Sequence, residues 1–104
     1  MLLVAVTRST VDLVRRLMYT ERRIAVGVTT LNDKIFVVYR QSPFIVVYMS
    51  QQPYTRLPNI SINGLKLPLD IAAGSSCLYV SDWGSAAIWR VKAEIGRASC
   101  RERV

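Results

Sequence analysis

The sequence predicts an all-β fold built from short strands, and three observations lead to this prediction. Runs of β-branched and aromatic residues recur from Ala25 onward, and each run has the length of a strand. Turn-forming Ser, Pro, Asp and Gly residues separate the runs. The pattern of runs and turns also occurs twice along the 104-residue chain. Together these features indicate a repeat architecture.

The two most apolar runs are "KIFVVY" (Lys34–Tyr39) and "FIVVYM" (Phe44–Met49). The residues between them include Ser42 and Pro43, both good turn formers, so the pair is predicted to form a hairpin. A further, outer strand is expected around Arg56–Ile62. Three shorter runs follow, "DIAAG", "CLYVS" and "AIWRV", and each of them is also expected to form a strand.

The strand pattern repeats at an offset of 43 residues, because the segment that begins at Gly27 overlays the segment that begins at Asp70 without a gap. Residues 35–37 then fall on residues 78–80, and the turn residue Ser42 falls on Ser85. A period of about 40–45 residues made of four short strands is typical of a β-propeller blade. The sequence therefore predicts a partial β-propeller with fewer than two four-stranded blades.

This period divides the chain into four parts. Residues 24–66 are predicted to form the first propeller-like blade, and residues 67–94 a second, truncated blade. Residues 1–23 have no counterpart at the offset. Val11, Val14, Leu17 and Met18 lie at helical spacing within them, opposite several arginines, so a short N-terminal helix is one interpretation and a strand of a preceding blade is the other.

The final ten residues, 95–104, break the strand pattern. Their codons can be written so that all ten positions resemble the translation of a common sequencing adapter. We therefore expect residues 95–104 to be an artefact and exclude them from the prediction of the fold. On this interpretation the blade that precedes them is interrupted.

The segment "CLYVSDWGSAAIWRV" resembles a propeller repeat of the NHL type, in which a "-YV-D-GN--I-R-" run spans a hairpin. It is less closely similar to the YWTD repeat, since Val80 and Ser81 stand where that family has Trp and Thr. The matching residues are Leu78, Tyr79, Asp82, Trp83, Gly84, Ile88 and Arg90. The resemblance implies a fragment of a larger propeller, whose partners would be its remaining blades and one or more proteins bound through its loops.

The residue types in this motif predict structural roles. Asp82 can accept hydrogen bonds from the backbone of its own turn. Gly84 is expected to supply a backbone conformation that residues with a Cβ atom avoid. Trp83 offers a large apolar surface for packing between blades.

The composition excludes several kinds of catalytic site. The chain has no histidine, which removes the commonest general base, the Ser-His and Cys-His pairs and most zinc sites. We therefore predict no catalytic, cofactor-binding or metal-binding residue, and a non-enzymatic interaction module. A propeller enzyme remains an alternative, and an oxygen-ligand site for calcium could draw on the following residues. They are Asn32, Asp33, Asn63, Asp70 and Asp82.

The formal net charge of +7 raises the question of nucleic-acid binding. The excess is spread over the chain, however, and the segment from Ala25 to Glu94 carries six cations against four anions. A mild and dispersed excess is typical of a solvated surface, so nucleic acid is not the expected partner, and an RNA-binding propeller is kept as an alternative. No apolar run approaches the roughly 18 residues of a membrane span, so no transmembrane segment is expected.

Overall fold

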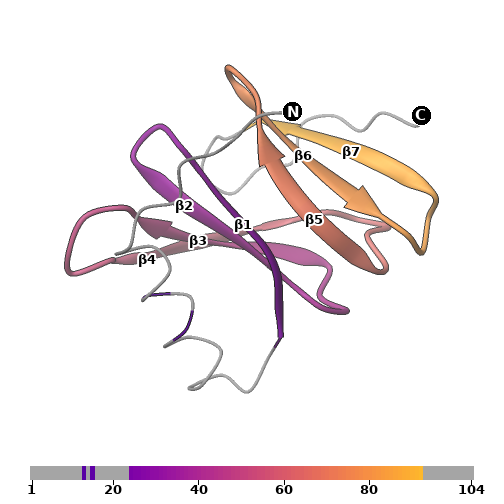
Figure 1. Ribbon diagram of the computed structural model, residues 1–104, viewed down its shortest axis with the longest axis horizontal. Coiled ribbons are helices and arrows are strands. Elements are labelled where there is room, and N and C mark those ends of the chain that lie inside the picture. The colour runs from indigo at the N-terminus through magenta and orange to yellow at the C-terminus, as the bar shows by residue number, and fades with distance from the viewer. Residues whose placement is uncertain (1–12, 14, 16–23, 93–104) are drawn as a thin grey trace.

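The computed structural model describes Leu13, Arg15 and residues 24–92 (Figure 1). They contain seven strands. The strands are β1 (Ala25–Leu31), β2 (Lys34–Tyr39), β3 (Phe44–Met49), β4 (Arg56–Ser61), β5 (Pro68–Ala73), β6 (Cys77–Asp82) and β7 (Ala87–Lys92). The prediction of an all-β fold is confirmed. The helix interpretation of residues 1–23 falls, apart from Leu13 and Arg15, outside the described residues, as does the predicted artefact at 95–104.

The strands form two antiparallel sheets in which neighbours in the chain are neighbours in space. One sheet has the order β1-β2-β3-β4 and the other the order β5-β6-β7. The predicted hairpin is confirmed, because β2 and β3 have the predicted bounds and pair with each other. Figure 1 shows the two sheets lying against each other, with β5 beside the first sheet. No helix long and apolar enough to cross a membrane occurs among the described residues.

A tight turn joins β1 to β2. Only Asn32 and Asp33 separate the two strands, and both have positive φ angles, 52° and 61°. Two-residue hairpin turns of this kind need left-handed backbone at both positions, and Asn and Asp tolerate it better than other residues with a side chain. The residue types at this turn thus set the register between β1 and β2.

The structure repeats at the offset found in the sequence. β5, β6 and β7 begin at residues 68, 77 and 87, each 43 residues after β1, β2 and β3 at 25, 34 and 44. The register of β1 on β2 shifts between Ala25 and Gly27, and that of β5 on β6 shifts between Pro68 and Asp70. These are again equivalent positions. The two sheets are therefore two copies of one unit, down to the irregularity in the first strand.

The larger hydrophobic cluster lies between the sheets and joins residues of β2, β3 and β4 to residues of β5, β6 and β7. Phe36, Val38 and Ile45 contribute from the first sheet, and Leu78 and Val80 from the second. Burial of aliphatic and aromatic side chains from both sheets supplies the main stabilisation of their contact.

A second cluster covers the opposite face of the first sheet, where Ile35, Val37 and Val46 pack with Leu13. Both faces of β2 and β3 are thus buried. This accounts for the unbroken apolar runs in their sequences, since a strand with one solvated face would alternate apolar and polar residues.

The sheets approach most closely where β1 meets β5. A Cβ atom on Gly27 would lie 2.9 Å from Oδ1 of Asp70 and 2.9 Å from the backbone nitrogen of Ile71. A side chain at Gly27 would therefore force the two strands apart. The glycine fixes the distance between the first strands of the two copies.

Candidate functional site

The structure divides the seven residues of the predicted motif between the two faces of the second sheet and the turn from β6 to β7. Leu78 is fully buried in the cluster between the sheets. Tyr79 and Ile88 lie on the opposite, open face, and Arg90 stands opposite Tyr79 in the neighbouring strand. The other three members of the motif belong to the end of β6 and the turn that follows it. They are Asp82, Trp83 and Gly84.

Asp82 is the centre of a hydrogen-bond network although it is only 3% exposed. Its Oδ1 accepts hydrogen bonds from the backbone N–H groups of Leu67 (2.7 Å) and Gly84 (3.1 Å). Its Oδ2 accepts from the N–H of Lys66 (3.0 Å), from Oγ of Ser85 (2.6 Å) and from Nε1 of Trp89 (3.2 Å). The predicted bond within its own turn is confirmed by the Gly84 contact.

This network joins two segments that are distant in the sequence. Lys66 and Leu67 precede β5, whereas Ser85 and Trp89 belong to the β6–β7 hairpin. A backbone bond from the N–H of Trp83 to the carbonyl of Leu67 adds to the connection (3.0 Å). The carboxylate thus fixes the β6–β7 turn to the segment that precedes β5. Side-chain bonds of Asp82 and the backbone bond of Trp83 both contribute to this connection.

The network also controls the ionisation of Asp82. Burial raises the pKa of this carboxyl group, but hydrogen bonds from Ser85, from the backbone of Leu67 and Lys66, and from Trp89 outweigh that effect. The resulting pKa lies below its ordinary value of 3.8, at about 2. Hydrogen bonds to the charged form favour it, so the carboxylate stays ionised in the folded protein throughout the neutral range.

The sequence-based explanation of Gly84 is wrong. Gly84 does not have a positive φ angle, whereas Gly64 does, at 101°. The reason for a glycine is lack of space, because a Cβ atom on Gly84 would lie 2.6 Å from Cβ of Lys66. The turn can approach the Lys66–Leu67 segment, and reach hydrogen-bond distance from it, only without a side chain at this position.

The two tryptophans have opposite surroundings. Trp89, which the motif did not include, is 5% exposed and belongs to the cluster between the sheets. Trp83, which was predicted to pack between blades, is 74% exposed and is not part of that cluster. A signal for the role of Trp89 was present in the sequence, since Trp89 alternates with Val91 on one face of β7.

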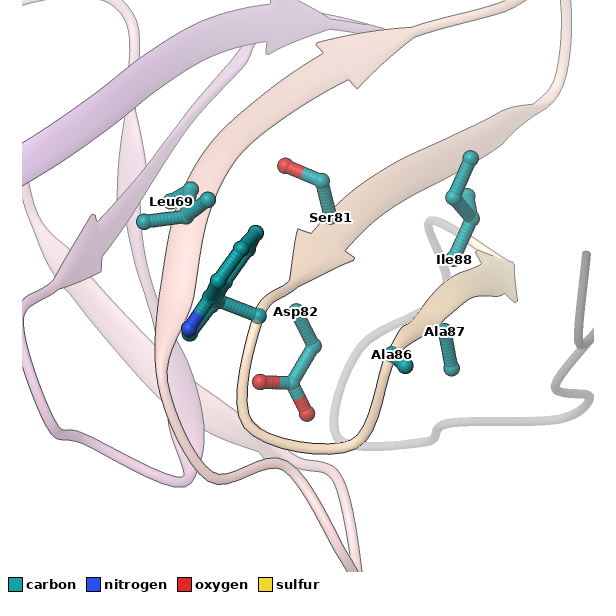
Figure 2. A pocket seen from close by; sticks show the side chains of 7 residues that line it. Leu69, Ser81, Asp82, Ala86, Ala87 and Ile88 are labelled. Atoms are coloured by element: carbon teal, nitrogen blue, oxygen red, sulfur yellow. The ribbon is translucent and has the colours of Figure 1, made fainter.

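Beside the turn, the open face of the second sheet forms a shallow apolar hollow. Figure 2 shows Leu69 of β5, Ser81 of β6 and Ile88 of β7 around it, with Ala86 and Ala87 at the turn. Trp83 also lines the hollow. Exposed apolar patches occur in proteins at protein contact surfaces, at membrane-binding sites and in ligand grooves.

Two of the three acidic residues of the calcium alternative, Asp70 and Asp82, accept hydrogen bonds from protein donors. The carboxylate of Asp82 accepts five hydrogen bonds, and Oδ1 of Asp70 accepts from the N–H of Ile71 (2.8 Å). Within residues 24–92 and the two described residues before them, no group of three His, Cys, Asp or Glu side chains is arranged to hold a metal ion.

Comparison with known proteins gives no relative. The sequence matches no family model, and it has no significant match among curated proteins or solved structures. The resemblance to the NHL repeat is a resemblance of the motif between Leu78 and Arg90, together with the 43-residue period.

Proposed function

We propose that this chain is a non-enzymatic protein-binding module, part of a larger β-propeller of the NHL type, and that the β6–β7 turn presents Trp83 to a protein partner. The observation that carries this proposal is the 74% exposure of a tryptophan on a turn whose neighbouring residue is held by five hydrogen bonds. The two-copy architecture supports the propeller part of the proposal, because sheets of equivalent strands packed face to face are how blades stack.

The chemistry of the turn suits recognition of a protein. Tryptophan is enriched among the residues that contribute most to protein–protein affinity, since it buries a large apolar area and can donate one hydrogen bond. A turn that is fixed before binding loses little conformational entropy when the partner arrives. Asp82 and Gly84 provide this fixation on both sides of Trp83.

The position equivalent to Trp83 in the first sheet shows whether a side chain there is covered when the two sheets pack together. Trp83 corresponds to Arg40 at the offset of 43, and Arg40 is exposed even though the first sheet is covered by the second. A side chain at this position therefore remains accessible when the neighbouring sheet is in place. The exposure of Trp83 is accordingly explained as a feature of a binding turn.

The test compares three proteins immobilised at equal density: the unmodified chain, Trp83→Ala and Arg40→Ala. We expect the unmodified chain and Arg40→Ala to capture the same protein. Its affinity for Trp83→Ala is expected to be lower by roughly tenfold or more, as for an interface hot spot. Affinity is then measured by calorimetry with the purified partner. Urea unfolding should give the same midpoint for all three proteins, since both positions are exposed. Equal affinity for Trp83→Ala and the unmodified chain would contradict the proposal.

A further inference from the structure

The edge strand β4 of the first sheet carries a short motif that the binding turn does not use. Residues 59–61 are Asn-Ile-Ser, which fits the acceptor pattern Asn-X-Ser/Thr, in which X is any residue except proline. We infer that Asn59 is the acceptor of an N-linked glycan, transferred from a lipid-linked oligosaccharide in the lumen of the endoplasmic reticulum. The inference goes beyond the proposed function and depends neither on the propeller nor on Trp83.

The strand places the two side chains that the pattern specifies on the side of the sheet away from the core. Ile60, the middle residue, is 1% exposed and belongs to the cluster between the two sheets. Neighbouring side chains of a strand point to opposite faces, so Asn59 and Ser61 point away from that cluster. Ser61 is exposed and Asn59 is half-buried. The unspecified residue of the motif therefore anchors the strand, while the amide and the hydroxyl reach solvent.

The strand β4 also has room for a bulky group. Among the described strands it pairs with β3 alone, so it forms an edge of the first sheet (Figure 1). A β-bulge lies at the acceptor residue, because Pro58 and Asn59 together stand opposite the single residue Val46. Bulges at sheet edges bend the strand and redirect its side chains, and Pro58 has no backbone N–H to offer to a further strand. A glycan is bulky and needs a surface position of this kind.

The hydrogen bond of the Asn59 side chain involves the oxygen of the amide and not the nitrogen that reacts. Oδ1 accepts from Nη2 of Arg56 (3.0 Å), and Cζ of Arg56 lies 5.5 Å from the centre of the Tyr48 ring. In the transfer, Nδ2 of Asn59 forms a bond to the anomeric carbon of the first sugar and releases one proton. The bond from this carbon to the diphosphate of the lipid breaks, and the lipid diphosphate leaves. Because Oδ1 remains an acceptor in the product, the contact with Arg56 is compatible with the glycan.

A second asparagine close to the motif provides an internal reference. Asn63 is exposed, but the residue two positions after it is Leu65, so it does not fit the acceptor pattern. Trypsin cleaves after the basic residues on either side of the two asparagines, so residues 57–66 form one peptide. Asn63 precedes Gly64, and an Asn-Gly pair loses ammonia slowly without an enzyme. Asn63 therefore reports the background conversion of asparagine to aspartate in the same peptide.

The experiment analyses this peptide from two sources, the protein isolated from its own cells and the full chain produced behind a secretory leader in mammalian cells. The digest is treated with peptide N-glycosidase in heavy-oxygen water, which converts a glycosylated asparagine into an aspartate that carries the heavy isotope. Fragment masses then assign the isotope to residue 59 or residue 63. Two variants of the full chain are compared with it: Ser61→Ala removes the hydroxyl of the motif, and Ser61→Thr retains it.

We expect the isotope at Asn59 to exceed that at Asn63 by roughly tenfold or more in the unmodified chain and in Ser61→Thr, and to fall to the level of Asn63 in Ser61→Ala. Ser61 is exposed, so both variants are expected to fold as the unmodified chain does. Isotope at Asn59 no greater than at Asn63, in either source, overturns the inference. Equal amounts at Asn59 in Ser61→Ala and Ser61→Thr also overturn it. Partner binding by Trp83→Ala has no bearing on these amounts, so the two proposals fail separately.

Discussion

Replacement of Asp82 by alanine is expected to lower the free energy of unfolding by about 3 kcal/mol or more at neutral pH, as judged from the cost of leaving one buried donor and several partly buried donors without an acceptor. Three of the five donors are backbone N–H groups, and a fourth is the indole of the buried Trp89. None of these groups can be satisfied by the methyl side chain. The loss is measured by urea unfolding followed through tryptophan fluorescence.

The pH dependence of stability distinguishes a lost carboxylate from a general loss of packing. The pKa of Asp82 falls from 3.8 to about 2 in the folded protein, so its ionised form stabilises the fold above pH 3.8. That contribution, about 2 kcal/mol for a shift of this size, is lost as the pH falls through about 2. The difference in stability between the unmodified chain and Asp82→Ala is therefore expected to shrink between pH 5 and pH 2. A difference that stays constant over this range would contradict the role assigned to the carboxylate.

Replacement of Phe36 by alanine is expected to cost about 3–5 kcal/mol, the usual cost of removing a buried phenylalanine. Phe36 is 1% exposed between the two sheets, and its removal leaves a cavity in the cluster that joins them. Tyr79, at the equivalent position of the second sheet, is 38% exposed. Tyr79→Ala is therefore expected to cost less than about 1 kcal/mol, as at an exposed site.

This pair of substitutions compares one position of the repeat in its covered and its open state. Both variants remove an aromatic ring from the third residue of an equivalent strand, so the strand propensities change in a similar way. Both are measured by urea unfolding at the same pH. Equal costs for the two variants would mean that the sheet face that carries Phe36 and the sheet face that carries Tyr79 are not covered differently.

Much of the fold could be predicted from the sequence because its determinants are local. The strands β2 and β3 consist of β-branched and aromatic residues bounded by turn formers, and their bounds were predicted correctly. The offset of 43 was detectable although few residues are identical in the two copies, because apolar and turn-forming positions recur at fixed spacing. The repeat thus reflects requirements of the backbone more than particular side chains.

The Asp82 network could be predicted only in part. Its bond to Gly84 follows from the short spacing of a turn, and this bond was expected. Its bonds to the backbone of Lys66 and Leu67 span 16 and 15 residues. Every residue except proline has a backbone N–H group, so no residue type marks these two as donors. The role of Gly84 was predicted wrongly because its cause is also a contact that is distant in the sequence. The glycine was explained by its backbone conformation, whereas the decisive factor is the close approach of Lys66.

The second sheet packs against the first through the cluster that joins Phe36 to Leu78, and the order of the two copies depends on this contact. The contact of β1 with β5 tests this packing directly, because Gly27 lies against the backbone of Ile71 there. The measurement is the nuclear Overhauser effect between the α protons of Gly27 and the amide proton of Ile71 in the full chain. We predict a strong cross-peak, comparable with those between paired strands such as β2 and β3. Absence of this cross-peak, while those within each sheet are present, would show that the two sheets form without packing in this way and would contradict the account.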